Sequence, residues 1–303
     1  MGDILLKASA YIFIIIAGYT LKKVGFFKPD DYKLILKITL NITMPAAVIT
    51  NFASFPFDNA LLYITLRSLG INLIMWGLGW VFSVGQKKET RVLYTLNFPG
   101  YNIGSFTMPY VQGFLGPAGV VCTCLFDAGN AIMCTGGSYA LSSRAVGGQG
   151  QSLKETLKKL FSTPFCTYLL MLVMAITGIA IPKFLLPITT TIGNANSFMA
   201  MLMVGTMFEF NPDKTFLKQA ATIILVRYAA AAAFAALFYF ALPFSAEIRQ
   251  TLAIICFAPN SAMTPAFTEK LKGNAALSSF VGSVSIVISV VIITLLIGAL
   301  GLN

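Results

Sequence analysis

The sequence contains no histidine and few charged residues, and both shortages restrict its possible chemistry. Histidine is the commonest general base and metal ligand near neutral pH, so its absence argues against zinc hydrolases. The five cysteines lack a zinc-type spacing and are best explained as small apolar packing residues. A glycine-rich phosphate loop followed by Lys-Ser/Thr is also missing, which argues against an ATP-driven pump. We therefore expect no metal, no cofactor and no enzyme activity.

Apolar residues, in contrast, are abundant. Of the 303 residues, 57% are hydrophobic and 11% are charged, whereas soluble domains average roughly 45–50% and about 25%. A helix needs about 20 apolar residues to cross a bilayer. Apolar segments separated by turns or charges lie at 4–22, 33–54, 59–83, 91–110, 117–142, 163–181, 187–208, 217–242, 249–268 and 275–301. The sequence thus predicts an all-α membrane protein of ten transmembrane helices.

The formal net charge of +10 could suggest a nucleic-acid partner, but the positions of the basic residues favour an orientation signal. One set of alternate loops contains Lys22, Lys23, Lys28, Lys33, Lys87, Lys88, Arg91, Arg144, Lys154, Lys158, Lys159, Lys214, Lys218, Lys270 and Lys272. The other set contains Lys7, Lys183 and Arg249. Because cytoplasmic loops are enriched in Lys and Arg, this predicts both termini outside the cytoplasm. We expect a plasma or bacterial inner membrane location and no nucleic-acid partner.

The longest loop, 143–162, divides the chain into halves of five segments each, 1–142 and 163–303. A shift of 158 positions places Arg91 on Arg249 and Asn102 on Asn260, and a shift of 160 places Arg67 on Arg227. An odd number of spans in each half makes two such repeats inverted relative to each other. Inverted repeats are typical of secondary transporters and occur in some channels.

The fourth and ninth segments each contain two prolines beside polar residues. Pro99 precedes Asn102, and Pro259 precedes Asn260 and Ser261. Proline interrupts the hydrogen bonding of a helix, and an interrupted backbone at membrane depth is tolerated where it is buried or lines a cavity. Paired breaks in two halves indicate a binding site, with helix ends suited to a carboxylate. The alternative is that these prolines are simple packing kinks.

Asp127 is the one acidic residue deep inside an apolar segment. At about 1.5 Å per residue it lies roughly 15 Å from the start of its segment, near the middle of a hydrocarbon core about 30 Å thick. Asn130 follows on the same helical face. Asp127 could couple protons or cations, anchor the broken backbone, or form an ion pair with Arg227. Asn41, also deep in a segment, could contact substrate or a neighbouring helix.

These motifs resemble those of one transporter family. The stretch from Asn102 to Pro109 resembles the Asn-x-Gly-x-x-Gly-x-Pro motif of the auxin efflux carrier family, with Thr107 in place of the second glycine. Phe126 to Asn130 is similar to that family's Tyr-Asp-x-x-Asn. The family includes plant auxin carriers and bacterial malonate carriers. The resemblance implies crossing, broken helices 4 and 9, a scaffold of helices 1, 2, 6 and 7, a moving domain, and often a homodimer.

The leading hypothesis is a secondary active transporter of small organic anions, either auxin-like or dicarboxylate, that works by elevator-type alternating access. Candidate substrate-binding residues are Asn41, Pro99, Asn102, Gly104, Pro259, Asn260 and Ser261, and candidate coupling or supporting residues are Asp127, Asn130 and Arg227. Membrane lipid is an expected partner, and proton coupling is a possibility left open by Asp127. The main alternative is a sodium-coupled symporter that resembles the bile acid family. An intramembrane enzyme and a sensor without transport are the alternatives from other classes.

Overall fold

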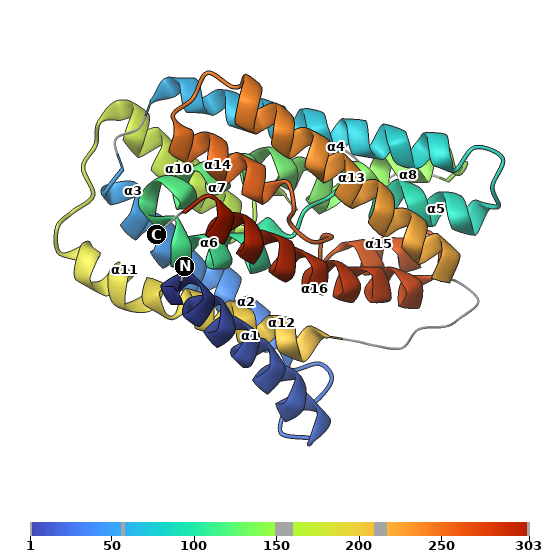
Figure 1. Cartoon of the computed structure of the whole chain (residues 1–303), viewed down its shortest axis with the longest axis horizontal. Helices are drawn as coiled ribbons and strands as arrows, with labels where there is room; N and C mark the ends of the chain where they lie inside the picture. The colour runs from blue at the N-terminus through green and yellow to red at the C-terminus, as the bar shows by residue number, and fades with distance from the viewer. Residues whose placement is uncertain (1, 56–57, 149–159, 209–216, 302–303) are drawn as a thin grey trace.

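The computed structural model describes residues 2–55, 58–148, 160–208 and 217–301, and this part of the chain is helical without a strand (Figure 1). The elements are α1 (Gly2–Lys23), α2 (Tyr32–Ile38), η1 (Thr39–Thr43), α3 (Met44–Ala53), η2 (Asn59–Leu62), α4 (Tyr63–Phe82), α5 (Lys88–Asn97), η3 (Ile103–Thr107), α6 (Met108–Phe114), α7 (Gly116–Ile132), η4 (Met133–Gly137), α8 (Ser138–Ala145), α10 (Thr163–Thr177), α11 (Leu185–Asn194), α12 (Asn196–Met207), α13 (Leu217–Ala241), α14 (Ala246–Ile255), α15 (Thr264–Lys270) and α16 (Ala275–Ala299).

Within the described residues, five helical stretches are long and apolar enough to cross a membrane. They are Tyr32–Ala53, Asn59–Phe82, Gly116–Ala145, Leu217–Ala241 and Ala275–Ala299. The prediction of an all-helical membrane protein is therefore confirmed, whereas the count of ten spans stays a prediction. The apolar segment 187–208 is not one helix, because α11 and α12 meet at Ala195.

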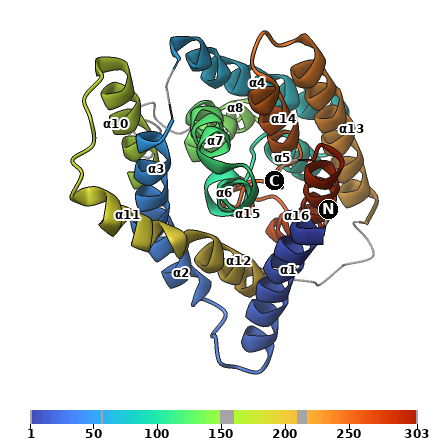
Figure 2. The same cartoon turned by 60° about the vertical axis from the view of Figure 1, so that its left-hand side comes forward.

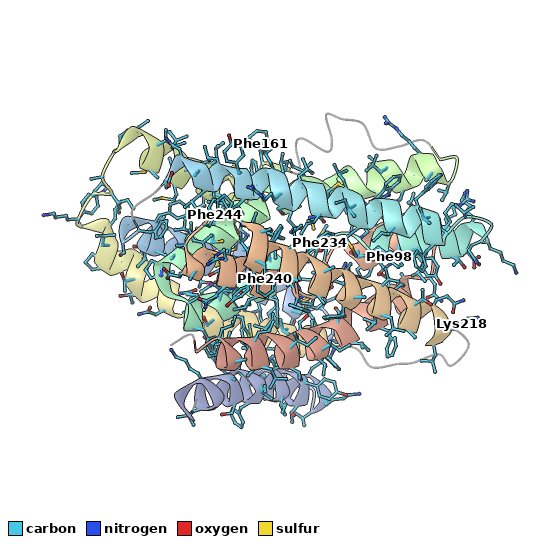
Figure 3. All side chains as sticks on the ribbon, turned by 45° about the horizontal axis from the view of Figure 1, so that its top comes forward. Phe98, Phe161, Lys218, Phe234, Phe240 and Phe244 are labelled. Atoms are coloured by element: carbon cyan, nitrogen blue, oxygen red, sulfur yellow. The ribbon has the colours of Figure 1, made fainter. Side chains whose placement is uncertain are left out.

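Large apolar side chains point outward along the helices, as expected for contact with lipid. Phe240 on α13 is 78% exposed and Phe13 on α1 is 71% exposed, and Figure 3 shows Phe240 near the end of α13 opposite to Lys218. Soluble proteins rarely expose extended apolar surfaces to water. In a bilayer the same side chains are solvated by lipid tails, which agrees with a multi-pass membrane protein.

The helices pack in two groups. In one group α1 packs along α12, and α3 packs against α10 and α11. In the other, α4 packs against α5 and α7, α14 against α7 and α13, and α15 against α16. Figure 2 shows α1, α2, α11 and α12 along one side, α4, α5, α13 and α14 along the opposite side, and α6, α7 and α15 between them. Helices α6, α7 and α15 thus lie in the interior of the molecule.

Glycines permit close backbone contact within each group. A Cβ atom on Gly205 of α12 would lie 2.1 Å from the carbonyl oxygen of Ile15 on α1. A Cβ atom on Gly129 of α7 would lie 2.1 Å from the carbonyl oxygen of Thr65 on α4. Small residues let membrane helices pack backbone to backbone, where van der Waals contact replaces the missing hydrophobic drive. Each group is therefore tightly packed within itself.

The ends of α4, α8 and α15 and the beginnings of α5, α13 and α16 gather at one end of the molecule (Figure 1). The described basic residues Lys87, Lys88, Arg144, Lys218 and Lys270 belong to these helix ends and loops. Lys154, Lys158, Lys159 and Lys214 of the predicted signal, like most of the loop 143–162, lie outside the described residues. The orientation in the membrane stays a prediction.

Candidate functional site

The first helix interruption lies between α5 and η3. Helix α5 ends at Asn97, and the helical path resumes at Ile103. Pro99 cannot donate a backbone hydrogen bond, and Gly100 has a φ of +84°, a conformation that L side chains rarely adopt. A Cβ atom on Gly100 would also lie 3.1 Å from Cβ of Ser261. Local sequence and close packing together therefore break the helix here.

The second interruption, between α14 and α15, meets the first one directly. Tyr101 and Asn260 form an isolated antiparallel β-bridge, and the backbone N–H of Asn102 donates to the carbonyl oxygen of Pro259 at 2.8 Å. At each break, backbone groups lack their helical hydrogen-bond partners, and the other break supplies some of these partners. Such pairing is required in a low-dielectric interior. Pro99, Asn102, Pro259, Asn260 and Ser261 of the predicted site thus come together at one crossing.

Two buried amide side chains hold the first break in place. The side chain of Asn130 accepts from the backbone N–H of Tyr101 at 3.0 Å and donates to the carbonyl oxygen of the same residue at 2.8 Å. The side-chain oxygen of Asn72 accepts from the N–H of Gly100 at 2.8 Å. We expected Asn130 in a supporting role, but we did not single out Asn72. The sequence does contain a signal for Asn72, because this residue is an amide in the middle of the apolar segment 59–83.

Asp127 does not pair with Arg227, so that alternative is wrong. Its carboxylate accepts from Nδ2 of Asn130 at 2.9 Å and from the hydroxyl of Tyr168 at 3.0 Å. Arg227 instead donates to backbone carbonyl groups at the end of α5. The reason is geometric: Asp127 faces Tyr168 on α10, whereas Arg227 on α13 faces the C-terminal end of α5. Among the described residues the one ion pair joins Lys33 and Asp30.

The side chain of Asn260 is occupied within the crossing. Its Nδ2 donates to the side-chain oxygen of Asn97 at 3.0 Å, and its own oxygen accepts from the N–H of Ser261 at 3.0 Å. Asn97 also accepts from the hydroxyl of Ser278 on α16 at 2.8 Å. Asn97 is therefore a central residue of the site that the sequence reasoning missed, although it lies beside Pro99 in the fourth segment.

A cavity of about 300 Å³ opens beside the crossing. Its wall includes Asn102, Asn260 and Ser261 from the crossing, and Tyr32 and Met207 from the group of α1, α2 and α12. In the described part of the chain, Nδ2 of Asn102 has no hydrogen-bond partner, while its side-chain oxygen accepts from the hydroxyl of Ser105. The cavity, between the two groups of helices, is therefore lined by a residue whose amide donor has no partner among the described residues.

Four of the predicted substrate-binding residues do not line this cavity, whose wall within the described chain is Tyr32, Asn102, Met207, Asn260, Ser261, Ala262, Pro265, Ala266, Glu269, Ala275, Ser279, Gly282, Ser283 and Ile286. Pro99 and Pro259 lie at the two breaks, and Gly104 lies near Met44 and the carboxylate of Asp127. Asn41 is exposed, donates to the carbonyl oxygen of Lys37 and accepts from the hydroxyl of Thr163 on α10 at 2.5 Å. Asn41 thus makes a helix contact, the structural alternative for this residue.

These features define a helical, multi-pass membrane protein with two interrupted helices that meet beside a cavity. The family model of membrane transport proteins matches residues 8–297. The chain therefore belongs to this family, the auxin efflux carrier family, and the resemblance found in its motifs is confirmed. As a member of a transporter family it acts on a small-molecule substrate. None of the curated proteins compared with the chain matches it.

Proposed function

We propose that this protein is a secondary active transporter of small organic anions and that the cavity at the helix crossing is its substrate site. The observation that carries the proposal is the free amide of Asn102, a donor suited to a carboxylate oxygen. The cavity volume of about 300 Å³ is at the lower end of the usual range for ligand sites, roughly 300–1,000 Å³. That size favours compact substrates such as small dicarboxylates or a single aromatic ring with a carboxylate.

We propose further that the chain comprises ten spans in two inverted repeats, 1–142 and 163–303, joined by a cytoplasmic linker. The matched positions of the two breaks support this arrangement, because inverted repeats place paired interruptions at the substrate site. In this scheme α1, α2, α3, α10, α11 and α12 form a scaffold, and the interrupted helices move against it. The cavity is suitably placed, since Tyr32 and Met207 belong to the scaffold and Asn102 and Ser261 to the moving part. A homodimer through the scaffold is part of the same proposal.

The cavity reaches the end of the molecule where the basic loops gather. Glu269, at the end of α15, and Ala275, at the beginning of α16, both line it. If that end is cytoplasmic, as the basic loops predict, the structure represents the inward-facing state. Glu269 is exposed, so water and salt screen its charge, and Lys270 and Lys272 follow it in the sequence.

The direct test combines binding and uptake with purified protein. A carboxylate that binds the folded state raises its thermal unfolding midpoint, and the same compound should accumulate saturably in proteoliposomes. Uptake should be unchanged when Na⁺ is replaced by choline; uptake that requires Na⁺ would favour the bile acid type of symporter. Binding without accumulation would favour a sensor. If no carboxylate shifts the midpoint or enters the vesicles, the proposal fails.

We propose that Asp127 carries the coupled proton. Its carboxylate has neutral hydrogen-bond partners, Asn130 and Tyr168, so protonation does not break an ion pair. Asp127→Asn should therefore preserve substrate exchange across the vesicle membrane but abolish the stimulation of net uptake by a pH gradient. Tyr168→Phe serves as a control, because it removes one hydrogen bond to Asp127 and leaves the carboxylate able to titrate. If a pH gradient still stimulates net uptake by Asp127→Asn, then Asp127 does not carry the coupled proton and has a structural role alone.

A further inference from the structure

Arg227 occupies an unusual position for a charged residue. It lies near the middle of α13 and is 4% exposed. Its Nη1 donates to the carbonyl oxygens of Asn97 at 3.2 Å, of Phe98, and of Pro99 at 3.3 Å, and its Nη2 donates to that of Gly100 at 3.1 Å. The guanidinium thus gathers carbonyl oxygens of consecutive residues at the first break. Its partners within the described chain include no carboxylate, since the ion pair found there joins Lys33 and Asp30.

The carbonyl groups that Arg227 contacts need a hydrogen-bond donor or a cation. The last carbonyl groups of a helix have no intrahelical donor, and they carry the negative end of the helix dipole. Here Pro99 cannot supply an N–H, and the chain leaves the helical path after Asn97. In transporters with interrupted helices, such convergent carbonyl groups can coordinate a coupling Na⁺. The guanidinium of Arg227 binds the same kind of cluster of carbonyl oxygens.

The second break is satisfied in a different way. The carbonyl oxygen of Phe257 accepts from the hydroxyl of Ser289 at 2.6 Å, and that of Pro259 accepts from the backbone N–H of Asn102 at 2.8 Å. Both donors are neutral. Arg67, the residue that the repeat alignment pairs with Arg227, packs over the rings of Tyr63 and Phe244. A charged side chain bound to the carbonyl groups of the break, as Arg227 is, is therefore a feature of the first break. Arg67 does not repeat it at the second.

We propose that Arg227 is a tethered substitute for a coordinated metal cation. It is a positioning residue: it holds the carbonyl groups from Asn97 to Gly100, and the ring of Tyr101 lies 5.2 Å from the guanidinium carbon. Tyr101 in turn precedes the substrate-facing Asn102. The protein thereby assembles its crossing without a dissociable cation. The inference rests on the proposed function only in taking the crossing as the substrate site.

The test is cation rescue of an Arg227→Ala variant. The thermal unfolding midpoint of purified protein is measured in NaCl and in choline chloride at equal ionic strength. The wild-type midpoint should be the same in both salts. Arg227→Ala should unfold at a lower temperature in choline, and Na⁺ should raise its midpoint saturably as the ion enters the vacated carbonyl cluster. The midpoint of Arg227→Ala is also compared in guanidinium and in urea, a neutral molecule of similar shape. This comparison checks that the emptied space is accessible.

Arg67→Ala is the matched control, because it removes a membrane-embedded arginine that lies over aromatic rings. Its midpoint should not respond to Na⁺. A folded Arg227→Ala without a Na⁺-specific rise would overturn the proposal, and so would an equal rise in the wild type. If Arg227→Ala does not fold, Arg227→Lys is compared with Arg227→Gln. The charge-retaining lysine should be the more stable, and the opposite order would also overturn the proposal. These readouts need no substrate, so their failure is distinct from failure of the transport proposal.

Discussion

Replacement of Asn102 by alanine should weaken carboxylate binding about tenfold to hundredfold while the protein stays folded. Hydrogen bonds to charged groups contribute about 1.5–3 kcal/mol, which corresponds to that range in affinity. The fold should tolerate the change because the contact of Asn102 that joins the two breaks, to the carbonyl oxygen of Pro259, is made by its backbone N–H. Among the described residues its side chain makes one hydrogen bond, which its oxygen accepts from the hydroxyl of Ser105. Affinity is measured by titrating the thermal unfolding midpoint with the carboxylate identified in the screen.

Asn41→Ala is the matched control for this experiment. Asn41 was also a candidate substrate residue in the sequence, but the structure places its side chain against Lys37 and Thr163. Its replacement should leave the affinity unchanged. Equal loss of affinity in the two variants would contradict the assignment of the cavity, and so would unchanged affinity in Asn102→Ala.

Asn130→Ala should destabilise the protein strongly. The variant leaves the N–H of Tyr101, a residue that is 4% exposed, without its partner, whereas the carbonyl group of Tyr101 keeps the N–H of Ile103 at 2.9 Å. A buried polar group left without a partner costs about 1–3 kcal/mol, and this is the expected loss of stability. Thermal unfolding in detergent measures the change.

Asn51→Ala provides the comparison for Asn130→Ala. The side chain of Asn51 is half-buried and donates within its own helix, to the carbonyl oxygen of Ala47 at 2.7 Å. That carbonyl group also has its ordinary helical partner, so the loss should be small. If the thermal unfolding midpoint of Asn130→Ala were as high as that of Asn51→Ala, the hydrogen bonds between Asn130 and the backbone of Tyr101 would contribute little to stability.

Much of the site could be predicted from residue types at membrane depth. Prolines in two apolar segments indicated the breaks, and a lone acidic residue with an amide on the same helical face indicated Asp127 and Asn130. These signals are strong because polar groups and helix breaks are costly in hydrocarbon and are kept for a reason. The roles of Asn72 and Asn97 were missed, since an isolated amide in an apolar segment does not reveal which backbone group it faces.

The sequence alone determined that this is a helical membrane protein of the auxin efflux carrier family, and where its helices break. Composition decides that the protein is a helical membrane protein, and the motifs around Asn102 and Asp127 carry its resemblance to the family. Local backbone chemistry decides the breaks in the fourth and ninth apolar segments. None of these points requires knowledge of distant contacts. The tertiary structure decided the partners: Asp127 with Tyr168, Asn260 with Asn97, and Arg227 with carbonyl groups rather than with an acid. Those pairings join residues far apart in the chain, and the directions of side chains on packed helices settle them.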